Sequence, residues 1–364
     1  MDYKNDELAH LIANQSLIIK PKTQIYIKYK SDDSIHFIKT LIHELSKKGG
    51  ICFPTRFNKE LEDYLLSTIN EDSIDLMLEK TEFENKKYDV FISVGSNDEF
   101  TKTKKNNQSL IDEYKRRKMQ LEKYKEGKQW LILNYPSIVD AAALDMDYEE
   151  YYKYAMDAMT YDFSLNIDSI NELNHMMKDA RNIRIIGDNV DLSFSKDNID
   201  AVSLLGNINL PDGEIYTSPI RNSVNGYIKY NVPSPKNSFI FEDIYLVFKD
   251  GRVVDFDVKD HKDEFEKIIN IDEGSRYIGE FAFGFNPMIN RPMYDILYDE
   301  KLCGSFHMAL GNAYKNAYNG NNSALHWDMI YLNKEGNYCD VYFDDVLVSS
   351  GGEFVPKRIR GLNK

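Results

Sequence analysis

The sequence predicts an α/β amino-terminal domain with a mainly parallel, doubly wound sheet over residues 1–185, followed by an α+β domain over residues 186–364. In the first half, short apolar runs alternate with segments of helical periodicity, which is typical of βαβ units. From about Ile183 onward, strand-like runs follow one another with turn signals between them. A chain of 364 residues also exceeds the usual size of one domain, so two domains are expected.

Each expected element of the first domain follows from a local pattern. The strands show alternation or a short apolar run, and the helices repeat apolar residues every three to four positions. In chain order, strands are expected at Gln24–Lys30, Gly50–Pro54, Tyr88–Val94 and Gln129–Tyr135, and helices at Ser34–Lys47, at Lys59–Ile69 and, polar in character, up to about Lys125. No glycine-rich phosphate-binding motif follows any of these strands, so the sheet need not hold a nucleotide.

The second domain is expected to be antiparallel. Ile183–Phe194 reads as a hairpin, and three alternating runs follow at Tyr227–Val232, Ile244–Phe248 and Arg252–Val258. The last two are joined by the turn Lys249–Gly251. This domain contains most of the chemically informative residues.

Composition excludes several classes of protein. Acidic residues number 59 against 45 basic ones, and the formal charge of −14 argues against general binding to nucleic acid or to an anionic membrane. The three cysteines form no CxxC pair, which favours a reducing compartment. The chain shows neither a secretory signal pattern at its start nor an apolar run of about 18 residues. We therefore expect a cytoplasmic protein.

Two pairs of residues in the second domain point to a metal site. His307 and Tyr314 are seven positions apart, so on a helix they would share one face. His326 and Asp328 are two positions apart, so on a strand they would share one face, with Trp327 on the other. Imidazole, carboxylate and phenol groups are metal ligands when a fold brings them together.

Two carboxylates complete the set. Glu214 follows the turn Pro211–Gly213, and Glu280 lies in an apolar run where an unpaired buried charge would be costly. Taken singly, each residue has an ordinary explanation. Glu214 could be a solvated carboxylate, Glu280 an exposed carboxylate at a strand edge, and His307 a histidine of the core. Together, Glu214, Glu280, His307, Tyr314, His326 and Asp328 are too many for one tetrahedral ion, and they suit two divalent ions of Zn, Co or Mn.

Two such ions would share a carboxylate and a bridging hydroxide. They lower the pKa of bound water from about 15.7 towards about 7, polarise a carbonyl group and can anchor an amine. This chemistry fits removal of the N-terminal residue from a peptide. Glu280 and Tyr314 would then act in catalysis as well as in metal binding.

The motifs also carry a family resemblance. In order, they are Leu210–Pro219 with Ser223–Gly226, Gly279–Glu280, Asp299–Glu300, His307–Tyr314 and His326–Asp328. They resemble the aminopeptidase T family of thermophilic metallopeptidases in order and in rough spacing. Ala9–Pro21, Trp130–Pro136 and Asn189–Phe194 are similar to that family more loosely.

The resemblance implies a dinuclear aminopeptidase whose metal ligands map onto the six residues named above. It also implies a cytoplasmic homodimer with an enclosed active site that admits short peptides. The chain is shorter than typical members, and Phe281–Met288 and Met329–Gly336 depart from the usual family sequence. Substrate preference is expected to differ accordingly.

Two alternatives remain open. His307, His326 and Asp328 alone could form a 2-His-1-carboxylate triad for non-haem Fe(II), similar to ring-cleaving dihydroxypyridine dioxygenases. The chain could instead be a metal- or peptide-binding protein without catalysis. In the aminopeptidase interpretation, Glu300 is the candidate general base or amine anchor.

Overall fold

A computed structural model describes residues 3–95 and 108–363 of the chain. Its contacts divide the chain into two compact units. Unit 1 comprises Met1–Thr160 with Gly206–Leu210, and unit 2 comprises Tyr161–Leu205 with Pro211–Lys364. The boundary after residue 185, between separately folding domains, remains a prediction.

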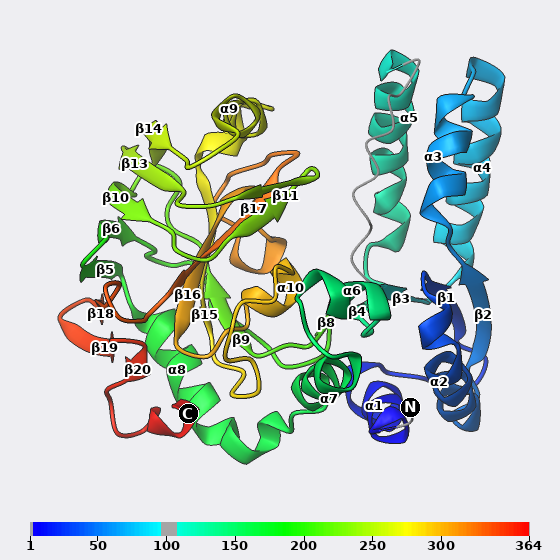
Figure 1. Ribbon diagram of the computed structural model, residues 1–364, viewed down its shortest axis with the longest axis horizontal. Coiled ribbons are helices and arrows are strands. Elements are labelled where there is room, and N and C mark those ends of the chain that lie inside the picture. The colour runs from blue at the N-terminus through cyan, green and yellow to red at the C-terminus, as the bar shows by residue number, and fades with distance from the viewer. Residues whose placement is uncertain (1–2, 96–107, 364) are drawn as a thin grey trace. The chain divides into compact units, whose positions relative to one another are not determined.

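Unit 1 is built on a parallel five-stranded sheet in the order β2-β1-β3-β4-β8 (Figure 1). Its strands are β1 (Gln24–Tyr29), β2 (Ile51–Arg56), β3 (Val90–Gly95), β4 (Gln129–Asn134) and β8 (Asn209–Leu210). Its helices are α1 (Asn5–Leu11), α2 (Ile35–Lys47), α3 (Lys59–Ser67), α4 (Glu71–Lys87), α5 (Gln108–Gln120), α6 (Ile138–Ala143) and α7 (Tyr148–Met159), with short turns at η1 (Ile12–Ser16), η2 (Asp32–Ser34) and η3 (Leu121–Lys125). The predicted parallel sheet with helices is therefore confirmed.

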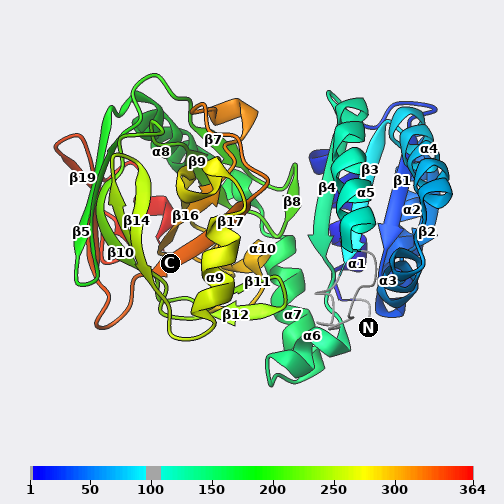
Figure 2. The same cartoon turned by 90° about the horizontal axis from the view of Figure 1, so that it is seen from above.

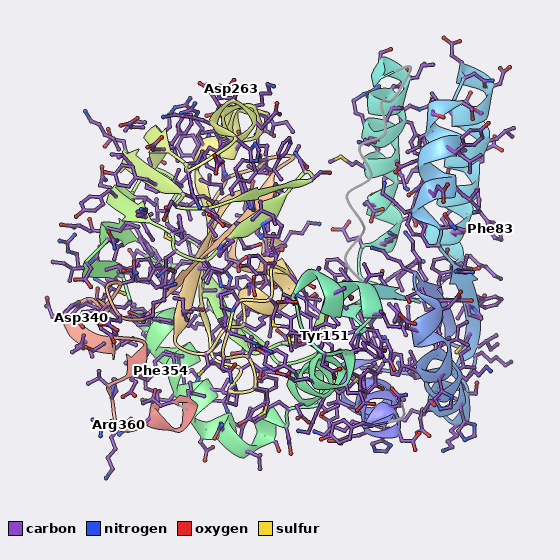
Figure 3. All side chains as sticks on the ribbon, in the orientation of Figure 1. Phe83, Tyr151, Asp263, Asp340, Phe354 and Arg360 are labelled. Carbon is purple, nitrogen blue, oxygen red and sulfur yellow. The ribbon has the colours of Figure 1, made fainter. Side chains whose placement is uncertain are left out.

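Helices α3, α4 and α5 form a small cluster of their own in unit 1. Its shared apolar residues are Leu66, Ile69, Ile74, Leu78, Ile111 and Tyr114. The sequence interpretation missed α4, although Asn70 and Ser73 form a capping box at its start. Phe83 of α4 is 62% exposed and lies on the outer side of that helix (Figure 3). Part of the polar helix expected before Lys125 lies outside the described residues, and α5 with η3 is its described part.

Unit 2 contains two larger antiparallel sheets and a short hairpin. The eight-stranded sheet has the order β14-β13-β10-β6-β5-β18-β19-β20, and the five-stranded sheet has the order β17-β16-β15-β9-β7. Figure 2 separates the two layers, with β5, β10 and β14 in one and β9, β16 and β17 in the other. The predicted α+β character of this half is confirmed.

The elements of unit 2 include three helices and several short turns. Its strands are β5 (Asn182–Gly187), β6 (Val190–Ser195), β7 (Val202–Leu204), β9 (Glu214–Thr217), β10 (Asn225–Lys229), β11 (Ser234–Lys236), β12 (Phe239–Phe241), β13 (Tyr245–Lys249), β14 (Arg252–Asp257), β15 (Ile278–Gly284), β16 (Ser305–Gly311), β17 (His326–Leu332), β18 (Cys339–Phe343), β19 (Val346–Ser350) and β20 (Glu353–Phe354). Its helices are α8 (Ile167–Asp179), α9 (Lys262–Ile269) and α10 (Ile296–Asp299), with turns at η4 (Phe163–Asn166), η5 (Glu273–Arg276), η6 (Lys315–Ala317) and η7 (Arg360–Leu362). The expected hairpin after Ile183 is the pair β5 and β6.

One local prediction is wrong. His307 lies on strand β16, and Tyr314 follows that strand immediately before η6, so the two residues do not share a helix. Seven successive residues of β16 are buried. Phe306, Met308 and Leu310 alternate with polar or small residues, which is typical of a strand, and the seven-residue spacing to Tyr314 gave a false helical signal. None of the described helices is both long and apolar enough to cross a membrane.

Candidate metal centre

The charged candidate ligands share one face of the five-stranded sheet of unit 2. Glu280 pairs with Ala309, which in turn pairs with Asp328 on the next strand. His307 pairs with Ala282, which lies two residues from Glu280. Because directly paired residues in antiparallel strands point to the same side, these side chains converge. The same register places Glu214 and His326 on that face through their glycine partners Gly284 and Gly311.

The opposite face of the same strands belongs to the apolar core. Phe281, Met308, Met329 and Trp327 alternate with the ligand candidates and are fully buried. On the ligand face, the residues between the candidates are small, as at Ala282 and Ala309. Strand alternation therefore separates a polar cluster from a packed core, and small residues leave room for the polar side chains.

A β-bulge at Gly279 aims Glu280 into the cluster. The pairing of β15 with β16 shifts between Ile278 and Glu280, which leaves Gly279 as the extra residue. A Cβ atom at Gly279 would lie 2.4 Å from the carbonyl oxygens of Gly311 and Asn312. Only glycine fits at this point without a shift of the backbone.

We expect Gly279→Ala to lower the free energy of unfolding by about 1–3 kcal/mol, because overpacking forces the backbone to move. The shift would also turn Glu280 away, so metal content per chain should fall. Chemical denaturation and elemental analysis measure the two effects. Gly95→Ala is the control, since a Cβ atom there would meet only the flexible side chain of Lys30, at 3.3 Å. Unchanged metal content in the Gly279 variant would contradict the role of the bulge.

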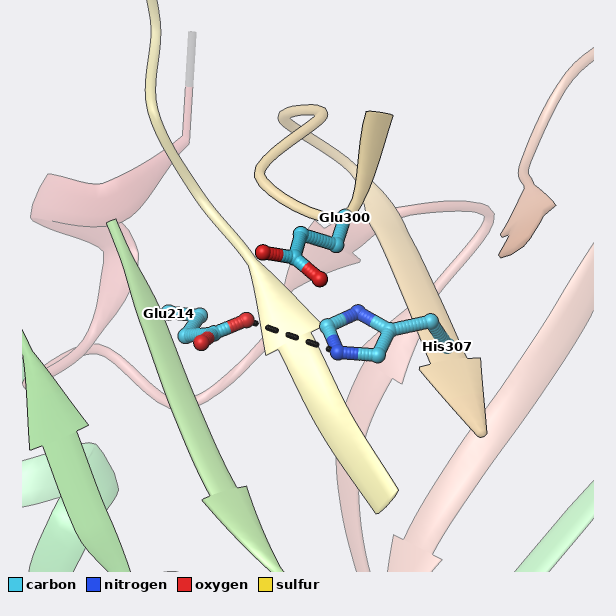
Figure 4. Close-up of side chains that lie close together, drawn as sticks. All are labelled: Glu214, Glu300 and His307. Atoms are coloured by element: carbon cyan, nitrogen blue, oxygen red, sulfur yellow. Dashed lines mark ion pairs between the residues drawn. The ribbon is translucent and has the colours of Figure 1, made fainter. Parts of the chain in front are cut away.

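The first group of ligand candidates surrounds His307. Its Nε2 atom lies 3.4 Å from Oε2 of Glu214 and 3.3 Å from Oε1 of Glu280. Asp328 Oδ1 is slightly farther from it, at 4.0 Å. Figure 4 shows the carboxylates of Glu214 and Glu300 converging on the ring of His307 from different chain segments.

The second group surrounds His326. Its Nε2 atom lies 3.6 Å from Oε2 of Glu280 and 3.4 Å from Oδ1 of Asp328. Its Nδ1 atom lies 2.9 Å from the carbonyl oxygen of Asn312, which fixes the ring with Nε2 towards the carboxylates. Glu280 thus presents one oxygen to each histidine.

The distances between the candidate ligand atoms fit divalent metal ions. Ligand atoms at about 2.0–2.2 Å from one tetrahedral ion are separated by about 3.3–3.6 Å, close to the separations around both histidines. Among the described residues, Glu214 Oε2, Glu280 Oε2 and Asp328 Oδ1 are buried without a hydrogen-bond partner. Buried carboxylate oxygens need a partner, and these three oxygens face the two imidazoles. The donor set and its unsatisfied atoms therefore fit a metal centre.

A family model described as thermophilic metalloprotease (M29) matches residues 1–337, which is most of the chain. The chain belongs to the M29 family of thermophilic metalloproteases. The resemblance predicted from the motifs is thereby confirmed.

Curated relatives of this M29 chain match over part of their length. Aminopeptidase 2 of Geobacillus stearothermophilus is 34% identical over 112 residues, which cover 30% of this chain and 27% of the relative. Aminopeptidase T of Thermus thermophilus is 28% identical over 156 residues, which cover 38% of each chain. The chain thus spans between about a quarter and two fifths of these relatives in the matches.

Two solved structures share the fold over nearly the whole chain. Wild-type AmpT from Thermus thermophilus has a TM-score of 0.78 at 19% identity, covering 98% of this chain and 100% of AmpT. The 2,5-dihydroxypyridine dioxygenase from Pseudomonas putida has a TM-score of 0.64 at 13% identity, covering 99% of both chains. At these identities the likeness shows a common fold.

Electrostatics in the M29 site favour protonated imidazoles while no metal is bound. Burial alone would lower the pKa of His307, but the hydrogen bond to Glu280 and the charges of Glu214 and Asp328 raise it to about 9. Burial would also lower the pKa of His326, but the neighbouring Asp328 and Glu280 raise it to about 10. Burial raises the pKa of Glu280. Metal ions must therefore displace protons when they bind.

The stability of the metal-free protein is expected to fall between pH 7 and pH 10. A histidine whose pKa is higher in the folded state than in the unfolded state stabilises the fold. This stabilisation is complete below the unfolded pKa of about 6.5 and is lost as pH rises through the folded pKa. The folded pKa is about 9 for His307 and about 10 for His326. Melting temperatures measured with chelator should decline over this range, whereas those of metal-loaded protein should not. His326→Gln should weaken the decline, and a flat profile in metal-free protein would contradict the assignment.

Tyr314 reaches the centre from the segment after β16. Its ring lies 4.6 Å from the ring of His326 and 5.7 Å from the ring of Tyr216, measured between centroids. Burial, with the negative charges of Glu280 and Asp328, raises the pKa of its phenol. The aromatic contacts, rather than helical spacing, place Tyr314 beside the cluster.

Glu300 and Lys301 complete the cluster, and Lys301 was missed in the sequence. Glu300 follows α10, and one of its oxygens lies within 4.8 Å of ligand atoms of Glu214 and His307. Burial raises its pKa well above the ordinary range. Burial would lower the pKa of Lys301, but Glu214, Glu300 and Asp212 raise it, so this lysine is charged. A lysine between Glu300 and Leu302 gives no signal of burial in the sequence.

Proposed function

We propose that this M29 chain is a metallo-aminopeptidase that removes N-terminal residues from short peptides, using two divalent ions of Zn, Co or Mn. The observation that carries the proposal is the position of Glu280, whose two oxygens face two different histidines. A carboxylate in this position can bridge two ions. The aminopeptidase names of the curated relatives support the same activity.

The proposal assigns a role to each of the six candidate ligands. Glu214 Oε2, Glu280 Oε1 and His307 would hold one ion, and Glu280 Oε2, His326 and Asp328 would hold the other. The phenol of Tyr314 would complete the second group from beside His326. When bound, the ions supply an activated water and polarise the scissile carbonyl group.

Glu300 is the proposed proton carrier. Burial raises the pKa of its carboxyl group and the neighbouring Lys301 opposes that rise, so Glu300 can accept a proton from the attacking water and release it to the leaving amine. Its position within 4.8 Å of Glu214 and His307 ligand atoms places it beside the proposed ions. The acidic cluster also suits the positive charge of a substrate's free amino terminus.

The test combines metal analysis with a substrate panel. We expect two equivalents of metal per chain, hydrolysis of aminoacyl p-nitroanilides, and no hydrolysis when the substrate amine is acetylated. Absence of turnover in metal-replete protein would overturn the proposal. A homodimer in the cytoplasm is also expected, and light scattering on purified protein would check the dimer.

A ring-cleaving Fe(II) dioxygenase is the second candidate. The likeness of fold to the dihydroxypyridine enzyme and the group of His307, His326 and Asp328 favour it. Glu214 and Glu280 weigh against it, because both carboxylates face the same imidazole and suit a second ion. Oxygen uptake by Fe(II)-loaded protein with hydroxylated pyridines would move this function to first place.

A further inference from the structure

Lys301 is a fully buried cation in the acidic cluster. Its Nζ atom donates to Glu214 Oε1 at 2.6 Å and to Glu300 Oε1 at 2.7 Å, and it lies 3.7 Å from Asp212 Oδ1. One ammonium group therefore contacts carboxylates from the turn before β9, from β9 and from the segment after α10. A lysine that offsets buried charge is common in proteins, so the oxygens it contacts decide its role.

The two carboxylate oxygens of Glu214 have different neighbours. Oε1 accepts from Lys301, whereas Oε2 has no hydrogen-bond partner among the described residues and lies 3.4 Å from His307 Nε2. Lys301 thus fixes the rotation of this carboxylate and leaves one oxygen for the metal side. The same ammonium group donates to Glu300 Oε1 at 2.7 Å and so holds the Glu300 carboxylate next to Glu214.

Without the lysine, the same carboxylates would suit a metal ion. Lys301 Nζ lies 2.6 Å from Glu214 Oε1 and 2.7 Å from Glu300 Oε1, and neither of these oxygens is assigned to the two proposed ions. Such a group attracts a divalent ion because buried carboxylates need a positive partner. An ion bound there would turn Glu214 away from the position that it shares with Glu280.

We propose that the Lys301 ammonium occupies a cation position between Glu214 and Glu300 and thereby confines metal ions to the two positions that Glu280 faces, beside His307 and beside His326. Lys301 is then a positioning residue that sets both the number and the place of the ions. The inference rests on the proposed dinuclear function. It adds a fixed cation to that site, contributed by the chain itself.

Lys301→Met tests the proposal, and Lys196→Met is the matched control. Lys196 is also fully buried, but its Nζ donates to the carbonyl oxygens of Lys178 and Ala180, at 3.0 and 3.2 Å. We would titrate Mn²⁺ into each metal-free protein, then measure bound ions per chain and the rise in melting temperature. Lys301→Met should bind one equivalent more than the wild type and gain a larger metal-induced rise. Its kcat should fall by about 10–100-fold, as for other partners of metal ligands. Lys196→Met should match the wild type in ion number and in metal-induced rise.

A second set of variants keeps the test decisive. If Lys301→Met folds only with Mn²⁺ present, the ion replaces the ammonium and the proposal is supported. If it folds in neither condition, Lys301→Gln retains a donor without the charge and should show the same gain. Adding Glu300→Gln to either variant should remove the extra equivalent. A Lys301 variant with the ion number and thermal shift of the wild type would overturn the proposal.

The wild-type measurement separates this inference from the proposed function. Wild-type protein that binds ions but cleaves no peptide would overturn the proposed aminopeptidase activity. The ion numbers of the Lys301 variants and the wild type would still test the inference. Wild-type protein that cleaves peptides, with a Lys301 variant of unchanged ion number, would overturn only the inference.

Discussion

Glu280→Gln is expected to abolish metal-dependent peptide hydrolysis. Glutamine has the same shape but offers one weak oxygen ligand, so it cannot bridge the groups around His307 and His326. Loss of an outer partner of a metal ligand alone costs about 10–100-fold in activity or metal affinity. We therefore expect kcat to fall by more than about 100-fold, measured as release of p-nitroaniline from an aminoacyl substrate at saturating metal.

Two measurements separate loss of the bridge from loss of the fold. Metal content of the Glu280 variant should fall, while its circular dichroism spectrum should remain that of the wild type. Glu353→Gln changes an exposed carboxylate on β20 and should leave both turnover and metal content unchanged. Retained turnover in Glu280→Gln would exclude this residue from the metal centre and remove the main support for two ions.

Trp327→Ala is expected to lower the free energy of unfolding of unit 2 by about 3–5 kcal/mol. Trp327 is fully buried, and its ring centroid lies 5.2 Å from that of Phe241 and 5.3 Å from that of Phe265. Its Nε1 atom donates to Ser234 Oγ at 2.8 Å. Truncation would leave a cavity behind β17 and remove one of the two hydrogen bonds of the Ser234 hydroxyl, which also donates to the Asp328 carbonyl oxygen at 3.2 Å.

The second tryptophan of the chain provides the control. Trp130 on β4 is 50% exposed, so Trp130→Ala should cost much less than Trp327→Ala in urea denaturation followed by circular dichroism. His326 and Asp328 flank Trp327 on the strand, so its removal should also weaken metal binding. Equal destabilisation by the two substitutions would show that β17 is not anchored by this ring.

Local patterns were sufficient to predict much of the fold and to name the candidate ligands. The alternation of strands with helices predicted the parallel sheet of unit 1, and β17 was predicted from the spacing of His326 and Asp328. The pairing of β15 with β16 could not be predicted in this way, because local alternation does not specify which strands pair or in which register. The seven-residue spacing of His307 and Tyr314 gave a false helical signal, because Tyr314 lies beyond the end of β16.

The arrangement of charges within the centre depends on tertiary contacts. Lys301 joins Glu214 to Glu300, which lie far apart in the sequence and become neighbours only when β9 approaches the segment after α10. The bulge at Gly279 depends on the register between β15 and β16, which no local pattern specifies. Sequence patterns can therefore name candidate ligands, whereas the position of Glu280 between two histidines and the lysine beside the cluster require the fold.

The distribution of the ligands over four strands has a consequence for folding. Glu214, Glu280, His307 and the pair on β17 meet only after β9, β15, β16 and β17 have paired in the correct register. A slip of one residue in any of these pairings would turn a ligand into the core. An ion at the proposed centre would therefore bind only after the sheet is complete. Such an ion would slow unfolding rather than nucleate folding, so we expect metal supply to affect the lifetime of the native protein more than the rate at which it forms.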